Sequence, residues 1–190
     1  LLAVRDVPVN SDILGQISAS NEPQIKQIFV TGANSQQELE LKLYVVRKKI
    51  EKAILKSNIA KERSFYIVSL STKQMVYKGM LTSLQLRDYY PDLSNANFTS
   101  GIALVHSRFS TNTFPTWDLA QPFRLLGHNG EINTIRGNRQ WMESRESVLK
   151  SDQLGNLQEL YPIVQPGMSD SASLDNVLEF LVMSGKSLPH

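Results

Sequence analysis

The sequence predicts an α+β fold, and two observations carry this prediction. Apolar residues recur at steps of three and four across residues 35–57, which is the period of an amphipathic helix. Two short runs rich in aromatic and β-branched residues flank a polar stretch within residues 64–80, which is typical of a β-hairpin with antiparallel pairing. A chain of 190 residues is long enough to build one sizeable core from such elements.

The first third of the chain predicts one strand and one long helix. Residues 1–25 contain several turn-forming residues and predict an irregular surface segment, whereas residues 26–31 have strand character. The helix of residues 35–57 has an apolar stripe that needs a covering layer: Leu39, Leu43, Val46, Ile50 and Ile54. Its basic residues are expected to face solvent: Lys42, Arg47, Lys48, Lys49 and Lys52. The helix should therefore pack through its apolar stripe.

The middle of the chain predicts a short helix and two further strands. Thr82 or Ser83 can cap a helix that ends before Pro91. Residues 101–110 form an apolar run that predicts a core strand. Residues 124–130 predict a shorter strand that ends in an Asn-Gly turn.

The last third of the chain predicts two helices. The first begins at Glu131, and Gly137 weakens it. The second is capped by Ser169 or Ser171 and stops at Gly185. Its apolar positions share one face: Leu174, Val177, Leu178 and Leu181.

The composition excludes several classes of protein and site. A formal net charge of +2 is too small to indicate a nucleic-acid or membrane partner, and no apolar run approaches the roughly 20 residues of a membrane-spanning helix. We therefore expect a cytoplasmic protein. The chain has no cysteine, which excludes disulfides, Cys-ligated metals and a thiol nucleophile within these 190 residues. Because the sequence begins with Leu1 instead of Met, an N-terminal truncation is expected.

Polar residues at the ends of the predicted strands and at the start of a helix are the candidates for chemistry. Arg108 follows the predicted core strand, where a guanidinium can either grip a substrate carboxylate or form an internal salt bridge. Asn129 and Gly130 indicate a tight turn, but an Asn amide beside a Gly N–H can also hold an oxyanion. Asp170 can either stabilise its helix N-terminus or bind a substrate ammonium group.

Two histidines lie among these candidates, at positions 106 and 128. With no cysteine and no His-Glu-x-x-His spacing, a metal site has little support. We therefore interpret His106 and His128 as structural residues and predict no metal.

The run HSRFSTNTFPTWDLAQPFRLLGHNGEINTIRGNRQWM closely resembles the glutaminase domain of glutamate synthases, which are class II glutamine amidotransferases with an N-terminal nucleophile. Weaker similarity covers RDVPVN, LYVVRKK, FYIVSLSTKQMVYKGML and PGMSDSASLDNVLE, and so nearly the whole chain. The resemblance implies a four-layer αββα sandwich of the N-terminal nucleophile hydrolase type, incomplete at its N-terminus. Residues 1–190 would then be part of one amidotransferase domain, without the nucleophile segment and the downstream synthase domains.

The resemblance also implies roles for individual residues. Arg108 would bind the α-carboxylate of L-glutamine, Asp170 its α-ammonium group, and Asn129 with Gly130 the tetrahedral oxyanion. The pocket beside the arginine would be lined by three further residues: Phe109, Thr111 and Asn112. The cysteine that attacks the side-chain amide would lie upstream of Leu1, so the 190 residues alone are expected to be inactive.

The implied reaction is hydrolysis of glutamine to glutamate and ammonia, which the synthase domains of the same chain would add to 2-oxoglutarate. Flavin mononucleotide (FMN) and an iron-sulfur cluster would support that step outside these residues, with either NAD(P)H or ferredoxin as electron donor and a small reductase subunit as a further partner. The missing cysteine leaves a second hypothesis, a non-catalytic binding or regulatory module with this fold. A third, another class II amidotransferase, explains the Arg and Asn-Gly signals but not the surrounding sequence.

Overall fold

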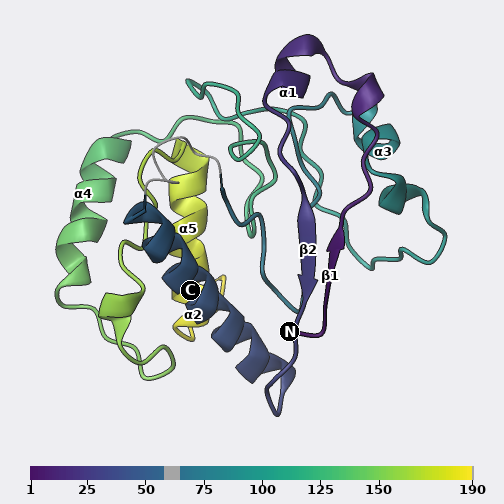
Figure 1. Cartoon of the computed structure of the whole chain (residues 1–190). Coiled ribbons are helices and arrows are strands. Elements are labelled where there is room, and N and C mark those ends of the chain that lie inside the picture. Colours follow the sequence, from purple (N-terminus) through teal and green to yellow (C-terminus); the bar gives the residue numbers. More distant parts are fainter. Residues whose placement is uncertain (58–64, 190) are drawn as a thin grey trace.

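A computed structural model describes residues 1–57 and 65–189 and has mixed helix and strand structure, as the sequence predicts. Figure 1 shows the three longest helices gathered on one side of the molecule and a small sheet on the other, with irregular segments between them. The helices are α2 (Gln36–Leu55), α4 (Ile135–Glu146) and α5 (Asp170–Met183). The strands are β1 (Ala3–Asp6) and β2 (Lys26–Phe29).

The N-terminal segment is more regular than predicted. β1 pairs antiparallel with β2, with Val4 opposite Ile28 and Asp6 opposite Lys26, and the Lys26 ammonium lies 2.6 Å from the Asp6 carboxylate. The interpretation of residues 1–25 as wholly irregular is therefore wrong. The pairing partner lies more than 20 residues away, so local turn residues could not reveal it.

Short helices and an aromatic cluster complete this side of the molecule. They are η1 (Ser11–Ile13), α1 (Gln16–Ser20), α3 (Gln85–Tyr89) and η3 (Pro91–Ser94). Tyr89, Tyr90 and Trp117 form the buried cluster, and the Trp117 indole N–H donates to the Ser18 carbonyl at 3.1 Å. The short helix before Pro91 is as predicted, but Leu84 is its N-cap residue and its side chain makes no capping hydrogen bond.

Helix α2 begins as predicted, because the Ser35 hydroxyl accepts a hydrogen bond from the Glu38 N–H. Its buried face agrees with the predicted apolar stripe only in part, since Leu43 is buried and Leu39 and Ile54 are partly buried. Val46 and Ile50 are exposed, whereas the side chains that are buried follow one helical face: Glu40, Leu43, Tyr44, Arg47 and Lys48. The expectation that Arg47 and Lys48 face solvent is wrong, because both find buried polar partners.

Helix α5 shows the same reversal. Its Ser169 cap and its stop at Gly185, which has a φ of +92°, are confirmed. However, the predicted apolar face is partly outside, since Leu174 and Leu181 are exposed. The buried positions are mostly polar: Ser171, Ala172, Ser173, Asp175, Asn176, Glu179 and Phe180.

A second hydrophobic core lies among the long helices. It joins Tyr44 of α2 and Phe180 of α5 to the segment around η4 (Leu157–Glu159), which contributes Leu154, Leu157, Leu160 and Ile163. Helix α4 starts at Ile135, four residues later than predicted, after Thr134 in a left-handed conformation. No residue of α4 is buried, and Trp141 is exposed.

Three segments that were predicted as strands are irregular in the described part of the chain: residues 65–80, 101–110 and 124–130. Ser64, the first residue of the predicted hairpin, lies outside the described residues. A strand needs a neighbouring backbone to satisfy its N–H and C=O groups, whereas backbone groups of Ile67, Leu125 and His128 bond to side chains instead. Residues 101–110 are also not a core strand, since Ile102 and Val105 are 89% and 73% exposed. The four-layer sandwich stays a prediction.

Candidate functional site

All predicted site residues except Asp170 lie on two segments that run side by side, residues 106–112 and residues 127–131. The His106 side chain lies against Gly127, where an added Cβ atom would be 3.5 Å from the ring. Thr111 donates from both its N–H and its hydroxyl to the Asn129 carbonyl, each at 2.9 Å. Further along, the Asn112 side-chain amide donates to Glu131 at 2.9 Å. These contacts bring the arginine-bearing segment against the Asn-Gly turn.

The side chain of His128 lies against Gly130 of the Asn-Gly turn. An added Cβ atom at Gly130 would lie 2.7 Å from His128 Cε1, so the imidazole occupies the space that any larger residue at position 130 would need. The Ser171 hydroxyl donates to the His128 carbonyl at 2.6 Å, and this hydroxyl oxygen lies 3.0 Å from His128 Nδ1. With the Ser171 proton assigned to the His128 carbonyl, the 3.0 Å contact fits the tautomer in which His128 Nδ1 donates to Ser171.

The N-terminus of α5 approaches the same turn. The Asp170 carboxylate accepts a hydrogen bond from the Ile132 N–H at 2.9 Å and lies 3.9 Å from the Arg139 guanidinium. Asp170 is half-buried, and Ile132 bonds to its Oδ2 atom, while Oδ1 is the oxygen nearest Arg139. The predicted ammonium-binding residue and the predicted oxyanion turn are therefore neighbours, two residues apart along the 130–132 backbone.

Arg108 is exposed and lines a small cavity of about 110 Å³. The cavity is also lined by Phe109, by His106 and by the segment around Gly79. Asn129 and Gly130 are not among its lining residues. The structure thus brings the segment of Arg108 against the segment of the Asn129–Gly130 turn. That Arg108 and the turn bind one and the same substrate stays a prediction. Phe109 lines this cavity, whereas Thr111 and Asn112 do not, and the role of all three in a substrate pocket stays a prediction.

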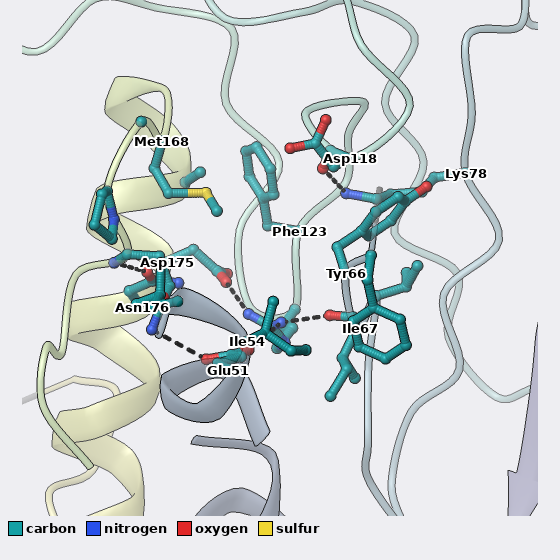
Figure 2. Close-up of a pocket in the computed structure, with 18 residues that line it drawn as sticks. Glu51, Ile54, Tyr66, Ile67, Lys78, Asp118, Phe123, Met168, Asp175 and Asn176 are labelled. Atoms are coloured by element: carbon teal, nitrogen blue, oxygen red, sulfur yellow. Dashed lines mark hydrogen bonds and ion pairs between the residues drawn. The ribbon is translucent and has the colours of Figure 1, made fainter. Parts of the chain in front are cut away.

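A larger cavity of about 330 Å³ lies between α2, α5 and the segment of residues 65–68 (Figure 2). Its walls combine the aromatic rings of Tyr66 and Phe123 with charged groups, among them Lys78 and Asp175. Burial lowers the pKa of Lys78 to about 7 and raises the pKa of Asp175 above its ordinary value. None of the predicted site residues lines this cavity.

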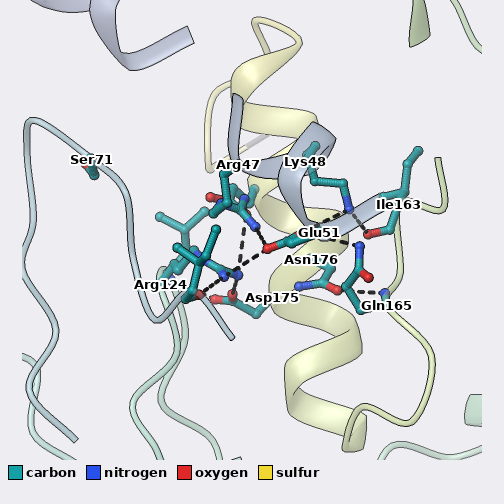
Figure 3. A network of polar contacts seen from close by, with 12 residues as sticks. Arg47, Lys48, Glu51, Ser71, Arg124, Ile163, Gln165, Asp175 and Asn176 are labelled. Atoms are coloured by element: carbon teal, nitrogen blue, oxygen red, sulfur yellow. Dashed lines mark hydrogen bonds and ion pairs between the residues drawn. The ribbon is translucent and has the colours of Figure 1, made fainter. Parts of the chain in front are cut away.

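Buried ion pairs hold α2 against α5 (Figure 3). The Arg47 guanidinium donates to Glu51 at 2.6 Å and also to Glu179. Arg124 lies 3.5 Å from Glu51, 3.8 Å from Glu179 and 3.9 Å from Asp175. Burial opposes ionisation of Glu51, yet the pKa of Glu51 lies below its ordinary value because Arg47, Lys48 and Arg124 surround the carboxylate.

This network reaches the candidate site through Asp175. Its Oδ1 atom accepts a hydrogen bond from the Leu125 N–H at 2.7 Å, four residues before the turn. Together with Asp170 and Ser171, it lets α5 hold the backbone of residues 125–132 at three points. The long helix thus serves as a rigid support for the segment that carries Asn129 and Gly130.

Sequence reasoning missed one residue that joins these segments. The Gln121 side chain bonds both to Ser110 and to the backbone of His128. Its position between two prolines predicted only a loop, and a long polar side chain in a loop carries no local sign of burial. His128 and Ser171 were predicted as a structural residue and a helix cap, and the contact between them joins α5 to the turn.

Among residues 1–57 and 65–189, no three His, Cys, Asp or Glu side chains gather as a metal site would require. No helix in these ranges is both long and apolar enough to cross a membrane.

Comparison with known proteins gives a consistent result. Residues 1–190 match the family described as glutamine amidotransferases class-II. The chain is 47% identical to the glutamate synthase (NADPH) large chain of Azospirillum brasilense over 97% of this chain and 12% of that protein. It is 50% identical to glutamate synthase (NADH) of Saccharomyces cerevisiae over 100% of this chain and 9% of that protein. It is 49% identical to ferredoxin-dependent glutamate synthase of Antithamnion sp., over 98% of this chain and 12% of that protein. The chain thus spans about a tenth of the length of these relatives.

Proposed function

Since the chain belongs to the class-II glutamine amidotransferases, we propose that it forms part of the glutaminase domain of a glutamate synthase. In this role it would bind L-glutamine, whose hydrolysis yields L-glutamate and ammonia for transfer to 2-oxoglutarate. The observation that carries the proposal is the meeting of three candidate groups: the segment of Arg108, the Asn129–Gly130 turn and the N-terminus of α5. The names of relatives that are 47–50% identical support the same assignment.

The chemistry of each group suits one part of glutamine. Arg108 would grip the α-carboxylate through two parallel hydrogen bonds, which an exposed guanidinium with no competing ion pair among the described residues can offer. Asp170 would accept a hydrogen bond from the α-ammonium group with the oxygen that does not bond to Ile132. The side-chain amide of Asn129 and the N–H of Gly130 would stabilise the negative charge on the side-chain carbonyl oxygen.

The predicted pocket residues would act mainly through shape. Thr111 and Asn112 already donate their side-chain protons to Asn129 and Glu131, so they would fix the turn and leave substrate binding to Arg108. Phe109 would supply an apolar wall beside the guanidinium. The fold that carries them would be the four-layer αββα sandwich of N-terminal nucleophile hydrolases.

The nucleophile would come from outside the 190 residues, which contain no cysteine. The α-amino group of that N-terminal cysteine would take the thiol proton as the sulfur attacks the side-chain amide carbon. It would return this proton to the nitrogen as the C–N bond breaks, which releases ammonia and leaves a thioester. Water would then hydrolyse the thioester to glutamate and restore the thiol. In both steps the oxyanion forms on the same oxygen, so one pair of donors serves the whole reaction. The 190 residues alone would bind without catalysing.

The remaining parts of the reaction would lie in other regions of the longer protein. Flavin mononucleotide (FMN) and an iron-sulfur cluster would support the addition of ammonia to 2-oxoglutarate in synthase domains, and a small reductase subunit can supply electrons. The relatives named as NADPH-, NADH- and ferredoxin-dependent are almost equally similar to this chain, so these residues do not decide the electron donor. We place the protein in the cytoplasm.

The test is the rate of glutamate release by the full-length glutamate synthase that contains this chain. Arg108→Ala should lower kcat/KM by at least about tenfold, because hydrogen bonds to charged groups contribute about 1.5–3 kcal/mol. Arg145→Ala, an exposed arginine near the end of α4, is the matched control and should leave kcat/KM unchanged. Unaltered turnover in the Arg108→Ala protein would exclude the carboxylate clamp.

The absence of cysteine from these residues also favours a second function, a binding or regulatory module without chemistry. This module would bind glutamine or glutamate through Arg108 and Asp170 but release no ammonia. Calorimetric binding of L-glutamine together with zero ammonia production by the full-length protein would support it. Ammonia release at a rate abolished by thiol alkylation would exclude it.

A further inference from the structure

The strongest unassigned feature is a buried primary amide that touches both halves of the candidate site. Gln121 is 7% exposed, and its Nε2 donates to the Ser110 hydroxyl at 2.9 Å and to the His128 carbonyl at 2.6 Å. Its Oε1 accepts from the His128 N–H at 2.7 Å. The side chain thus pairs with both backbone groups of His128, as a neighbouring strand would do.

The two contacted residues are the ones that place the candidate groups. Ser110 follows Arg108 by two residues, and His128 immediately precedes Asn129. A change in the Gln121 amide would therefore alter the separation of the guanidinium from the oxyanion donors. Other hydrogen bonds also join the two segments, but each is weaker or open to water. The Ser110 hydroxyl is 3.4 Å from the His128 carbonyl, and the bonds made by Thr111 and Asn112 are exposed, so water competes with them.

The amide is itself rigidly held. The Lys78 ammonium donates to the carbonyls of Asp118 and Ala120, at 2.6 and 2.7 Å, directly before Gln121 in the chain. After Gln121, the Phe123 N–H donates to the Leu126 carbonyl at 2.8 Å and closes the loop. A buried side chain on a loop fixed at both ends has few alternative rotamers, which suits it for holding a distance.

We infer that Gln121 is a positioning residue that sets the separation between the carboxylate clamp at Arg108 and the oxyanion donors at Asn129 and Gly130. This inference rests on the proposed glutaminase function and deepens it. Gln121 does not touch the substrate. It aligns the side-chain carbonyl of a glutamine whose α-carboxylate is held by Arg108, so its loss should lower turnover more than binding.

The experiment uses the full-length protein that contains this chain, with two substitutions at the same position. Gln121→Met keeps the length of the side chain and removes all three hydrogen bonds. Gln121→Glu keeps the acceptor for the His128 N–H but loses the donor to Ser110 and to the His128 carbonyl. The matched control is Gln165→Met, because Gln165 also donates within the protein, to Glu51 and the Pro162 carbonyl, without contacting the site segments.

Two kinetic constants separate positioning from binding. For Gln121→Met we expect kcat for glutamate release to fall by about 10²-fold, the loss that a misplacement near 1 Å produces. The inhibition constant of L-glutamate depends mainly on the charged α-groups that Arg108 and Asp170 would hold. It should change by less than about threefold, a factor that corresponds to well under one charged hydrogen bond. Gln165→Met should leave both constants at their wild-type values.

The Gln121→Glu variant gives a second measurement, a pH profile, that a general loss of stability would not change. A protonated carboxyl can donate a hydrogen bond again, so the activity of Gln121→Glu relative to wild type should rise as the pH falls from about 8 towards about 6, approaching the raised pKa of a buried glutamic acid. If Gln121→Met does not fold, this pH profile decides the question. A flat ratio between Gln121→Glu and wild type would overturn the inference.

The outcomes distinguish this inference from the function on which it rests. Glutamine hydrolysis by the wild-type protein with unchanged kcat in Gln121→Met would overturn the positioning role alone. A wild-type protein that releases no glutamate from glutamine would overturn the proposed function, and the positioning role with it. Equal losses of kcat in Gln121→Met and Gln165→Met would show a general effect of losing a hydrogen-bonded side-chain amide and also overturn the inference.

Discussion

Substitution of Arg47 by Met tests the buried ion network that joins α2 to α5. Arg47 is 1% exposed and donates to Glu51 and Glu179, so its removal leaves two carboxylates with weaker partners. Loss of one member of a buried ion pair typically costs about 3–5 kcal/mol. Arg124 stays 3.5 Å from Glu51 and 3.8 Å from Glu179, beyond good hydrogen-bonding distance, and offsets part of the loss. We therefore expect a cost near the lower bound, about 3 kcal/mol.

The measurement is hydrogen exchange of peptides from α2 and α5 in the full-length protein, since the opening of these helices reports their local stability. A loss of about 3 kcal/mol should accelerate exchange by roughly 10²-fold, at about 1.4 kcal/mol per factor of ten. The control is Lys42→Met, which breaks an exposed ion pair with Glu38 and should cost at most about 1 kcal/mol. Equal effects of Arg47→Met and Lys42→Met would refute the reasoning.

Two further predictions use the same exchange measurement. Gly79→Ala should destabilise the aromatic cluster by about 1–3 kcal/mol or more, because the added Cβ would lie 2.3 Å from the Trp117 ring. Gly137→Ala should instead stabilise α4 by about 0.4–1 kcal/mol, because no heavy atom lies within 4 Å of the added Cβ. Similar effects of the two substitutions would contradict this. In the folded protein the pKa of Lys78 is lowered to about 7 from 10.5, so the unfolded state binds more protons than the folded state between these pH values. The stability of wild type relative to Lys78→Met should therefore rise as the pH rises across this window. A stability difference between wild type and Lys78→Met that does not change with pH would contradict this prediction.

Local signals in the sequence predicted the positions of helices well. Ser35 and Ser169 cap α2 and α5 as expected, because a cap depends on only the next three residues. Gly185 ends α5 for an equally local reason. Strand β1 was missed because pairing with β2 depends on residues more than 20 positions away.

The orientation of the helices could not be predicted in this way. Periodicity identified the apolar stripes, but in the structure α2 and α5 turn polar faces towards each other, with Arg47 between Glu51 and Glu179. The partner of Arg47 on α5 is 132 residues distant in sequence, and no local pattern pairs them. Arg124, which approaches the same carboxylates, comes from a third segment.

The candidate site was predicted in its residues more than in its supports. The resemblance named Arg108, Asn129, Gly130 and Asp170 because family motifs carry them, and the structure brings their segments together. The supports were not evident, since Gln121 acts through three hydrogen bonds that exist only in the folded chain. A glutamine in a proline-containing loop has no sequence signature of such a role.

The most direct test of the central claim is a crystal structure of the full-length protein with L-glutamate bound. The account predicts the α-carboxylate within hydrogen-bonding distance of the Arg108 guanidinium, the ammonium group on Asp170, and the side-chain carboxyl facing Asn129 and Gly130. Glutamate bound instead in the larger cavity beside Glu51 and Lys78, with the Arg108 guanidinium facing solvent, would contradict it.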